Sequence, residues 1–206
     1  MQIGVLGGTF NPPHIGHLRL AEEAASQLGL DRVLLVLSAI PPHKEASEIL
    51  PVESRWKMLT LACEGSERLV PSDIEVNRTG PSFTIDTLRQ IKSGLDQGDE
   101  LHLIIGMDCW DEIETWKSYD EILRDFRLVV ANRGDHYLRD GVGEVDSGIK
   151  IIDIPQLDIS SSQIREALRN NSSVRFLVPD PVLEWIKQNG LYQAEASQEM
   201  NRKAVV

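Results

Sequence analysis

The chain has 206 residues, 41% hydrophobic and 26% charged, which is enough to enclose the core of one compact domain. Its net charge of −11 repels the phosphates of nucleic acids and of anionic membranes, so neither is expected as a partner. No apolar run approaches the roughly 18 to 20 residues that span a bilayer, and the first residues lack the basic and apolar regions of a signal peptide, so we expect a cytoplasmic protein.

The first part of the chain alternates buried strands with a helix. Residues 3–7 (IGVLG) are a short apolar run that ends in glycine, which is typical of a buried parallel strand. From Leu18 onward, apolar residues recur every three or four positions, as on one face of a helix, and Gly29 is a suitable residue to end it. A second buried strand is predicted over 33–37, and a loop follows over 38–50.

The same alternation continues through the rest of the chain. Helices are predicted over 52–63, 84–93, 161–169 and 180–188, and strands over 69–74, 101–105, 127–131 and 150–154. Pro181 in the first turn and Gly190 just past the end delimit the last helix. Residues 193–206 are polar and aperiodic, and we expect a flexible tail there.

This order of elements predicts an α/β fold, namely a Rossmann-like, doubly wound parallel sheet with helices on both faces. A single domain is expected over 1–192, with a small C-terminal helical part over about 160–192. Ligands bind beyond the carboxyl ends of the strands in such sheets. The loops 7–17, 38–44, 106–116 and 155–165 all follow predicted strands. We therefore expect these four loops to form one shared site.

The loop GGTFNPPHIGH at 7–17 has the composition of a phosphate site. Gly7 and Gly8 allow a sharp turn and a close approach of the backbone to a ligand. The prolines lead into a helix whose first-turn amides and dipole favour an anion. His14 and His17 are three residues apart, so one helical face would direct both rings to the same place, and Gly16 would keep that face open.

Other interpretations of this loop are weaker. It contains neither the GxxxxGK[ST] nor the GxGxxG pattern. A histidine pair could bind a metal, but the chain has no HExxH motif and no obvious third ligand, so no protein-bound metal is predicted. A purely structural histidine pair is the remaining alternative.

A second motif, ISSSQIR at 159–165, lies near the other end of the chain. Its serines supply hydroxyls and amides at a predicted helix start, and Arg165 follows one turn later. Arginine is a fixed cation that suits the oxygens of a triphosphate. An ordinary serine-capped helix with a surface arginine is the structural alternative.

Together, HIGH at 14–17 and ISSSQIR resemble the two motifs of the HxGH nucleotidyltransferase superfamily. Further segments resemble the bacterial nicotinate-nucleotide adenylyltransferases: PPHK at 41–44, TGPSFTIDTL at 79–88, GMD at 106–108, and VPDPVLEWIKQNGLY at 178–192. The resemblance covers residues 1–192. It implies the reaction of ATP with nicotinate mononucleotide to give deamido-NAD and pyrophosphate. It also implies Mg²⁺, which would arrive bound to the ATP phosphates.

The resemblance also implies a role for individual residues. His14, His17 and Arg165 would stabilise charge on the phosphates during transfer. The residues implied to bind ATP are Gly7, Gly8, Thr9, Phe10, Gly16, Gly106, Asp108, Ser161 and Ser162. The residues implied to bind the second substrate are Lys44, Phe83, Thr84 and Trp116. Trp116 would stack on the pyridine ring, and the amides near Phe83 and Thr84 would bind its carboxylate.

Several points stay open at this level. Phe83 stands where the family usually has tyrosine, which leaves the preference for the acid over the amide unsettled. One alternative is adenylyl or cytidylyl transfer to another phosphate acceptor, such as nicotinamide mononucleotide or phosphopantetheine. The other is a non-catalytic nucleotide-binding regulator. The sequence does not determine the oligomeric state, and a homo-oligomer is one of the alternatives. Cys63 and Cys109 are interpreted as reduced, packed thiols. The remaining tryptophans, interpreted as packing residues, are Trp56, Trp110 and Trp185.

Overall fold

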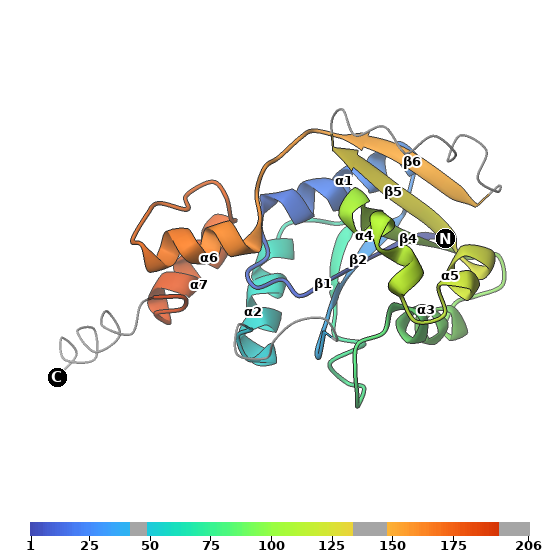
Figure 1. Cartoon of the computed structure of the whole chain (residues 1–206), viewed down its shortest axis with the longest axis horizontal. Coiled ribbons are helices and arrows are strands. Elements are labelled where there is room, and N and C mark those ends of the chain that lie inside the picture. Colours follow the sequence, from blue (N-terminus) through green and yellow to red (C-terminus); the bar gives the residue numbers. More distant parts are fainter. Residues whose placement is uncertain (42–48, 134–147, 194–206) are drawn as a thin grey trace.

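The computed structural model describes residues 1–41, 49–133 and 148–193. Six strands form one sheet in the order β3-β2-β1-β4-β5-β6, and all neighbours are parallel (Figure 1). The strands are β1 (Gln2–Gly8), β2 (Arg32–Leu37), β3 (Leu69–Ser72), β4 (Glu100–Gly106), β5 (Arg127–Arg133) and β6 (Ile149–Ile154). This is the strand order of the doubly wound dinucleotide-binding fold, so the predicted fold class is confirmed.

The helices are close to the predicted ranges, with three additions. They are α1 (Ile15–Leu28), α2 (Val52–Cys63), α3 (Thr84–Ser93), α4 (Met107–Asp111), the 3₁₀ turn η2 (Ile113–Thr115), α5 (Tyr119–Asp125), α6 (Ser161–Arg169) and α7 (Asp180–Gln188). The sequence analysis missed α4, η2 and α5 because segments of three to seven residues show too few turns for a helical period to emerge. It also extended β3 too far, since the strand ends at Ser72.

Alternating side chains along the strands bury both faces of the sheet. On one face, Leu6, Leu35 and Ile104 pack with the alanine-rich side of α1 and with α2. On the other face, Val5, Leu103 and Leu128 pack with α3, η2 and α5. Neighbouring strand residues therefore belong to different cores, which explains the nearly continuous apolar runs in the sequence.

A third apolar cluster joins the C-terminal helices to the rest of the fold. Ile164 of α6 and Val182 of α7 pack against Met58 of α2. In Figure 1, α6 and α7 lie beside α2, away from the β5–β6 edge of the sheet. The amide of Ile15 also donates to the carbonyl of Leu177, which fixes the start of α1 against this C-terminal part. Within the described ranges, no helix is long and apolar enough to cross a membrane.

Candidate active site

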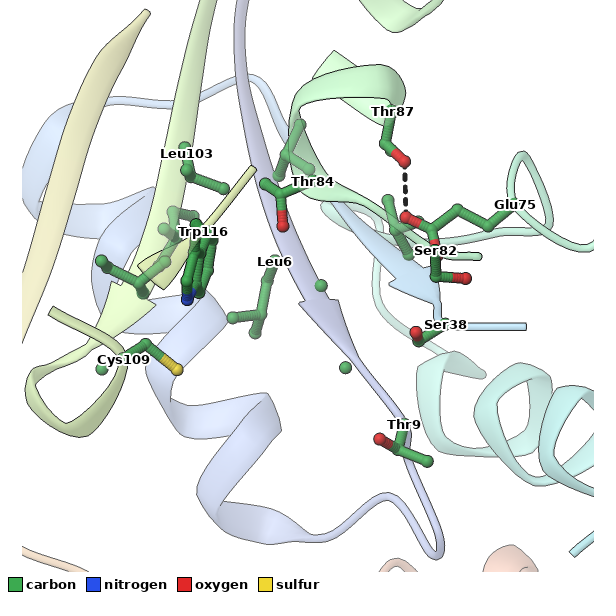
Figure 2. Close-up of a pocket in the computed structure, with 17 residues that line it drawn as sticks. Leu6, Thr9, Ser38, Glu75, Ser82, Thr84, Thr87, Leu103, Cys109 and Trp116 are labelled. Carbon is green, nitrogen blue, oxygen red and sulfur yellow. Dashed lines mark hydrogen bonds between the residues drawn. The ribbon is translucent and has the colours of Figure 1, made fainter. Parts of the chain in front are cut away.

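A pocket opens at the carboxyl ends of β1, β2 and β4, where the strand order reverses between β1 and β4 (Figure 2). This is the switch point at which doubly wound sheets bind ligands. Of the predicted site residues, it is lined by Gly7, Gly8, Thr9, Thr84, Gly106 and Trp116. Among the lining residues that the sequence analysis did not select for the site are five that carry a hydroxyl, a carboxylate or a thiol, namely Ser38, Glu75, Ser82, Thr87 and Cys109. Of the four loops expected to form one site, those after β1, β2 and β4 thus meet at this pocket, whereas the loop at 155–165 does not line it.

Two walls of this pocket come from segments that face each other in Figure 2. Trp116 follows η2 and turns its indole toward the pocket, while Thr84 begins α3. Within the part of the chain that the structure describes, the amide of Thr84 has no hydrogen-bond partner. The amide of Phe83, in contrast, donates to the carbonyl of Pro81 at 3.1 Å. The Phe83 amide is therefore already committed, whereas that of Thr84, a residue that lines the pocket, is not.

The ring of Phe83 faces a cation instead of the pocket. The Lys117 ammonium lies 4.6 Å from the ring centroid and 2.8 Å from Oδ2 of Asp86. Asp86 stands in the first turn of α3, and Lys117 directly follows Trp116. These contacts tie the two walls of the pocket together.

The histidine pair lies just beyond the pocket, at the start of α1. His14 is the N-cap of that helix and has an extended backbone, so the two histidines do not share a helical face as expected. A reciprocal capping arrangement brings them together instead: the amide of His14 donates to Nδ1 of His17 at 3.2 Å. The ring centroids are 3.7 Å apart. An amide can only donate here, so the proton of a neutral His17 ring is on Nε2.

Two glycines of this loop lie in close packing. A Cβ on Gly16 would lie 3.0 Å from Nδ1 of His14, and a Cβ on Gly8 would lie 2.9 Å from the Phe10 ring. Phe10 itself is 1% exposed, and its ring meets the His17 ring edge-on with 5.0 Å between centroids. The Phe10 ring therefore packs beneath the loop and supports His17, so a contact of Phe10 with ATP would involve its main chain, and its role in ATP binding stays a prediction.

The ISSSQIR segment meets the same loop across the fold. Ser160 caps α6 together with Gln163, as the serine run predicted. The Ser161 hydroxyl donates to the carbonyl of Pro12 at 2.8 Å, and Nη1 of Arg165 donates to the carbonyl of Asn11 at 3.0 Å. Nη2 of Arg165 donates to Ser162 Oγ at 3.2 Å. The two motifs from opposite ends of the chain thus form one unit.

The side chain of Asn11 joins this unit to two further segments. Its Oδ1 accepts a hydrogen bond from the hydroxyl of Tyr192 at 2.8 Å and from the amide of Leu50 at 3.4 Å. Burial raises the pKa of the Tyr192 hydroxyl above its ordinary range, which keeps it a neutral donor. The last described residues of the chain therefore help to hold the loop before α1.

Arg55 lies inside the protein and supports the loops that follow β1 and β2. It is 2% exposed, and its guanidinium donates to four main-chain carbonyls. These are Leu50 at 2.9 Å, Thr9 at 3.0 Å, Ser38 at 2.6 Å and Ala39 at 3.1 Å. Burial lowers the pKa of this guanidinium, while the nearby Tyr192 and Glu53 act in the opposite direction. Arg55 is thus a buried cation that fixes the backbone on both sides of the pocket.

The sequence analysis missed Arg55, although a signal was present. Arg55, Leu59 and Ala62 recur at spacings of four and three, which places the arginine on the buried face of α2. A buried arginine requires several acceptors, and loop carbonyls can supply them. Asn11 and Tyr192 gave no comparable signal, because their bond joins residues 181 positions apart.

Glu75 is a buried carboxylate at the pocket wall. The Thr87 hydroxyl donates to its Oε1, and Nη2 of Arg78 donates to the same hydroxyl at 3.0 Å. Nη2 of Arg78 is 3.9 Å from Oε1 of Glu75. Because Thr87 lies one turn into α3, this trio anchors the helix that carries Thr84.

The remaining predicted residues have separate outcomes. Asp108 is exposed in the first turn of α4 and does not line the pocket, whereas its neighbour Gly106 does. Lys44 lies outside the described residues. Within those residues, no three His, Cys, Asp or Glu side chains gather as a metal site. Cys109 is exposed, so its interpretation as a packed thiol is wrong, while Cys63 is buried as expected. Trp56, Trp110 and Trp185 pack against apolar clusters, as predicted.

Comparison with known proteins identifies the family of this chain. A family model described as cytidylyltransferase-like matches residues 5–167. A relative from Trichlorobacter lovleyi, named a probable nicotinate-nucleotide adenylyltransferase, is 37% identical and covers 94% of this chain and 100% of its own. A relative of the same name from Pseudomonas fluorescens is 39% identical, with 94% and 98% covered. The chain belongs to the nicotinate-nucleotide adenylyltransferase family.

Solved structures support the fold of this adenylyltransferase. The Plasmodium falciparum nicotinic acid mononucleotide adenylyltransferase complexed with NaAD superposes with a TM-score of 0.78 at 19% identity, over 93% of this chain and 97% of the other. The same protein complexed with APC gives a TM-score of 0.76. As a member of its family, the chain is an enzyme of the nucleotidyltransferase class.

Proposed function

We propose that this adenylyltransferase moves AMP from ATP to nicotinate mononucleotide, giving deamido-NAD and pyrophosphate. An oxygen of the acceptor's phosphate attacks the α-phosphorus of ATP and forms the new P–O bond. The bond from the α-phosphorus to the bridging oxygen breaks, and pyrophosphate leaves with its electron pair. One observation carries the proposal: the HIGH loop and the ISSSQIR helix are bonded together beside a pocket walled by Trp116 and Thr84.

In this proposal, the loop at 7–17 and the start of α6 stabilise the negative charge that develops on the ATP phosphates during transfer. The enzyme forms no covalent intermediate. His17 donates a hydrogen bond from Nε2 to a phosphate oxygen, because its Nδ1 accepts one from the His14 amide. Nη1 and Nη2 of Arg165 each donate one hydrogen bond, to Asn11 and to Ser162. Their second N–H groups suit phosphate oxygens. A well-placed donor to such charge contributes on the order of 3 kcal/mol. His14 acts with them as the neighbour that orients His17.

Magnesium belongs to the substrate side of this proposal. Mg²⁺ keeps several waters and is commonly bound through substrate phosphates and one or two carboxylates. We assign it to the ATP phosphates, where it would neutralise charge on the leaving pyrophosphate. The protein residues that would face those phosphates are cations and hydroxyls, namely Arg165, Ser161 and Ser162.

The pocket is proposed to hold the pyridine ring of the acceptor. The indole of Trp116 offers an aromatic face for stacking, and the Thr84 amide at the start of α3 offers a donor for the ring carboxylate. The Phe83 ring contributes no polar group, so the missing tyrosine hydroxyl does not remove a contact from this arrangement. Preference for the acid then depends on Thr84 and its surroundings.

The test is pyrophosphate release with a panel of substrates. ATP or CTP is combined in turn with nicotinate mononucleotide, nicotinamide mononucleotide and phosphopantetheine. We expect release with ATP and nicotinate mononucleotide, and at least tenfold lower kcat/KM with the other combinations. Faster release with another acceptor would reassign the substrate, and no release with any acceptor would favour a non-catalytic regulator.

A further inference from the structure

The hydroxyl of Ser82 is held in one orientation by the turn that follows β2. The amide of Ala39 donates to its Oγ at 3.0 Å, and the amide of Ile40 donates to the same atom at 3.1 Å. The amide of Ser82 in turn donates to the carbonyl of Ile40 at 2.9 Å. Ser82 therefore binds the turn over 38–40 through three hydrogen bonds, although it lies more than forty residues further along the chain.

Arg55 holds the other side of the same turn. Its guanidinium takes the carbonyls of Ser38 and Ala39, and each carbonyl shares a planar peptide unit with the amide that Ser82 accepts. In a trans peptide the carbonyl and the amide point in opposite directions. Two successive peptide units are thus fixed from both ends, by a buried cation on one side and a hydroxyl oxygen on the other.

This arrangement leaves the Ser82 hydroxyl a single function. A serine oxygen has two lone pairs and one proton, and both lone pairs are taken by the two amides. Over 1–41, 49–133 and 148–193, the structure gives no acceptor for the proton. Ser82 also lines the pocket, where Figure 2 shows it beside Glu75 and across from Trp116. Among the described residues, its remaining hydrogen-bonding capacity is therefore that of a donor, which is available to an acceptor in the pocket.

We infer that Ser82 is a specificity-determining residue whose hydroxyl donates to an anionic oxygen of the acceptor nucleotide. This inference rests on the proposed function, because it takes the acceptor to occupy this pocket. The oxygen belongs either to the pyridine carboxylate or to the phosphate, which are the two anionic groups of nicotinate mononucleotide. A donor with no other acceptor gains most from a charged one.

The experiment compares Ser82→Ala with the wild type by calorimetric binding and by steady-state kinetics. Ser93→Ala is the matched control: it removes a hydroxyl at the far end of α3, where Ser93 Oγ, among the residues that the structure describes, donates to the carbonyl of Gln90 alone. We expect Ser82→Ala to raise the Kd and KM of nicotinate mononucleotide about tenfold or more, with the constants for ATP and those of Ser93→Ala within twofold of the wild type.

Nicotinamide mononucleotide, which lacks the carboxylate but keeps the phosphate, identifies the oxygen. An equal rise for both mononucleotides assigns the phosphate, and a rise for the nicotinate compound alone assigns the carboxylate. Unchanged acceptor constants would overturn the inference. A parallel rise in the constants for ATP would also overturn it, because it would show that Ser82 only shapes the loop. Tight acceptor binding without pyrophosphate release would instead count against the proposed reaction alone.

Discussion

The hydroxyl of Tyr192 donates to Oδ1 of Asn11 at 2.8 Å, joining the end of the described chain to the loop before α1. Through Asn11 this bond reaches Arg165, which holds the carbonyl of the same residue, and Leu50, whose amide shares the same Oδ1. The C-terminal segment thus belongs to the phosphate side of the site, although it lies far from that site in sequence.

Loss of this hydroxyl tests the link. Tyr192→Phe should lower the free energy of unfolding by about 1 to 2 kcal/mol, because the buried Oδ1 of Asn11 loses the hydrogen bond from Tyr192, which is shorter than the one from Leu50. It should also raise the KM for ATP severalfold, since the loop that positions His14 and His17 loses one of its supports. Chemical denaturation and steady-state kinetics measure the two effects. Tyr119→Phe, on the other side of the sheet, is the control, and equal KM values in both variants would contradict the link.

His17 should be the most sensitive residue of the site to truncation. We expect His17→Ala to fold and to lose about a hundredfold or more in kcat, because a donor to the charge developing on the phosphates is removed. Circular dichroism checks the fold, and pyrophosphate release gives the rate. A turnover within about threefold of the wild type would show that the Nε2 proton stabilises no charge in the reaction.

Arg55 should affect both stability and substrate binding. Arg55→Met leaves four carbonyls without their donor, so the free energy of unfolding should fall by about 3 kcal/mol or more, and the KM values for ATP and acceptor should rise together. Met58→Ala, a buried change one turn further along α2, should cost about 2 to 5 kcal/mol and leave both KM values within twofold. If the two variants had the same kinetics, Arg55 would serve stability alone.

Burial of Cys63 should make the protein less stable at alkaline pH. Burial raises the pKa of this thiol from 9.0 to about 11, so the unfolded chain loses the proton at a lower pH than the folded one. The contribution is fully present below pH 9 and is lost as the pH rises through about 11. Urea denaturation over this range should show a smaller decrease in Cys63→Ala than in the wild type. Equal slopes would show that the thiol does not contribute.

The two cysteines should also differ in chemical reactivity. Cys109 is exposed and lines the pocket, whereas Cys63 is buried with a raised pKa. Iodoacetamide at pH 8 should therefore alkylate Cys109 alone in the folded protein, and nicotinate mononucleotide should slow the reaction. Peptide mass spectrometry identifies the modified residue, with Cys109→Ser as the control. Faster labelling of Cys63, or labelling unaffected by nucleotide, would contradict this placement of the pocket.

The sequence by itself determined the order of strands and helices, the fold class and the two phosphate motifs. Periodicity reports which residues face a core, and the caps at Gly29 and Ser160 are local, so both can be recognised in a short window. The same window is too short to show α4 or α5, and it placed His14 on a helical face although a capping bond decides its position.

Only the tertiary structure decided which residues brace the loop at 7–17 and the pocket beside it. Arg55, Asn11 and Ser82 act through main-chain groups of other segments, and main-chain groups carry no sequence signature. Tyr192 acts through the side chain of Asn11, which is 181 positions away in the chain. The Phe10 ring is buried and Cys109 is exposed for a related reason, since burial depends on which segments the fold packs against a residue. The chemistry of the loop at 7–17 could be predicted from its composition, but its shape depends on Arg55, Ser161, Arg165 and Tyr192, which only folding brings to it.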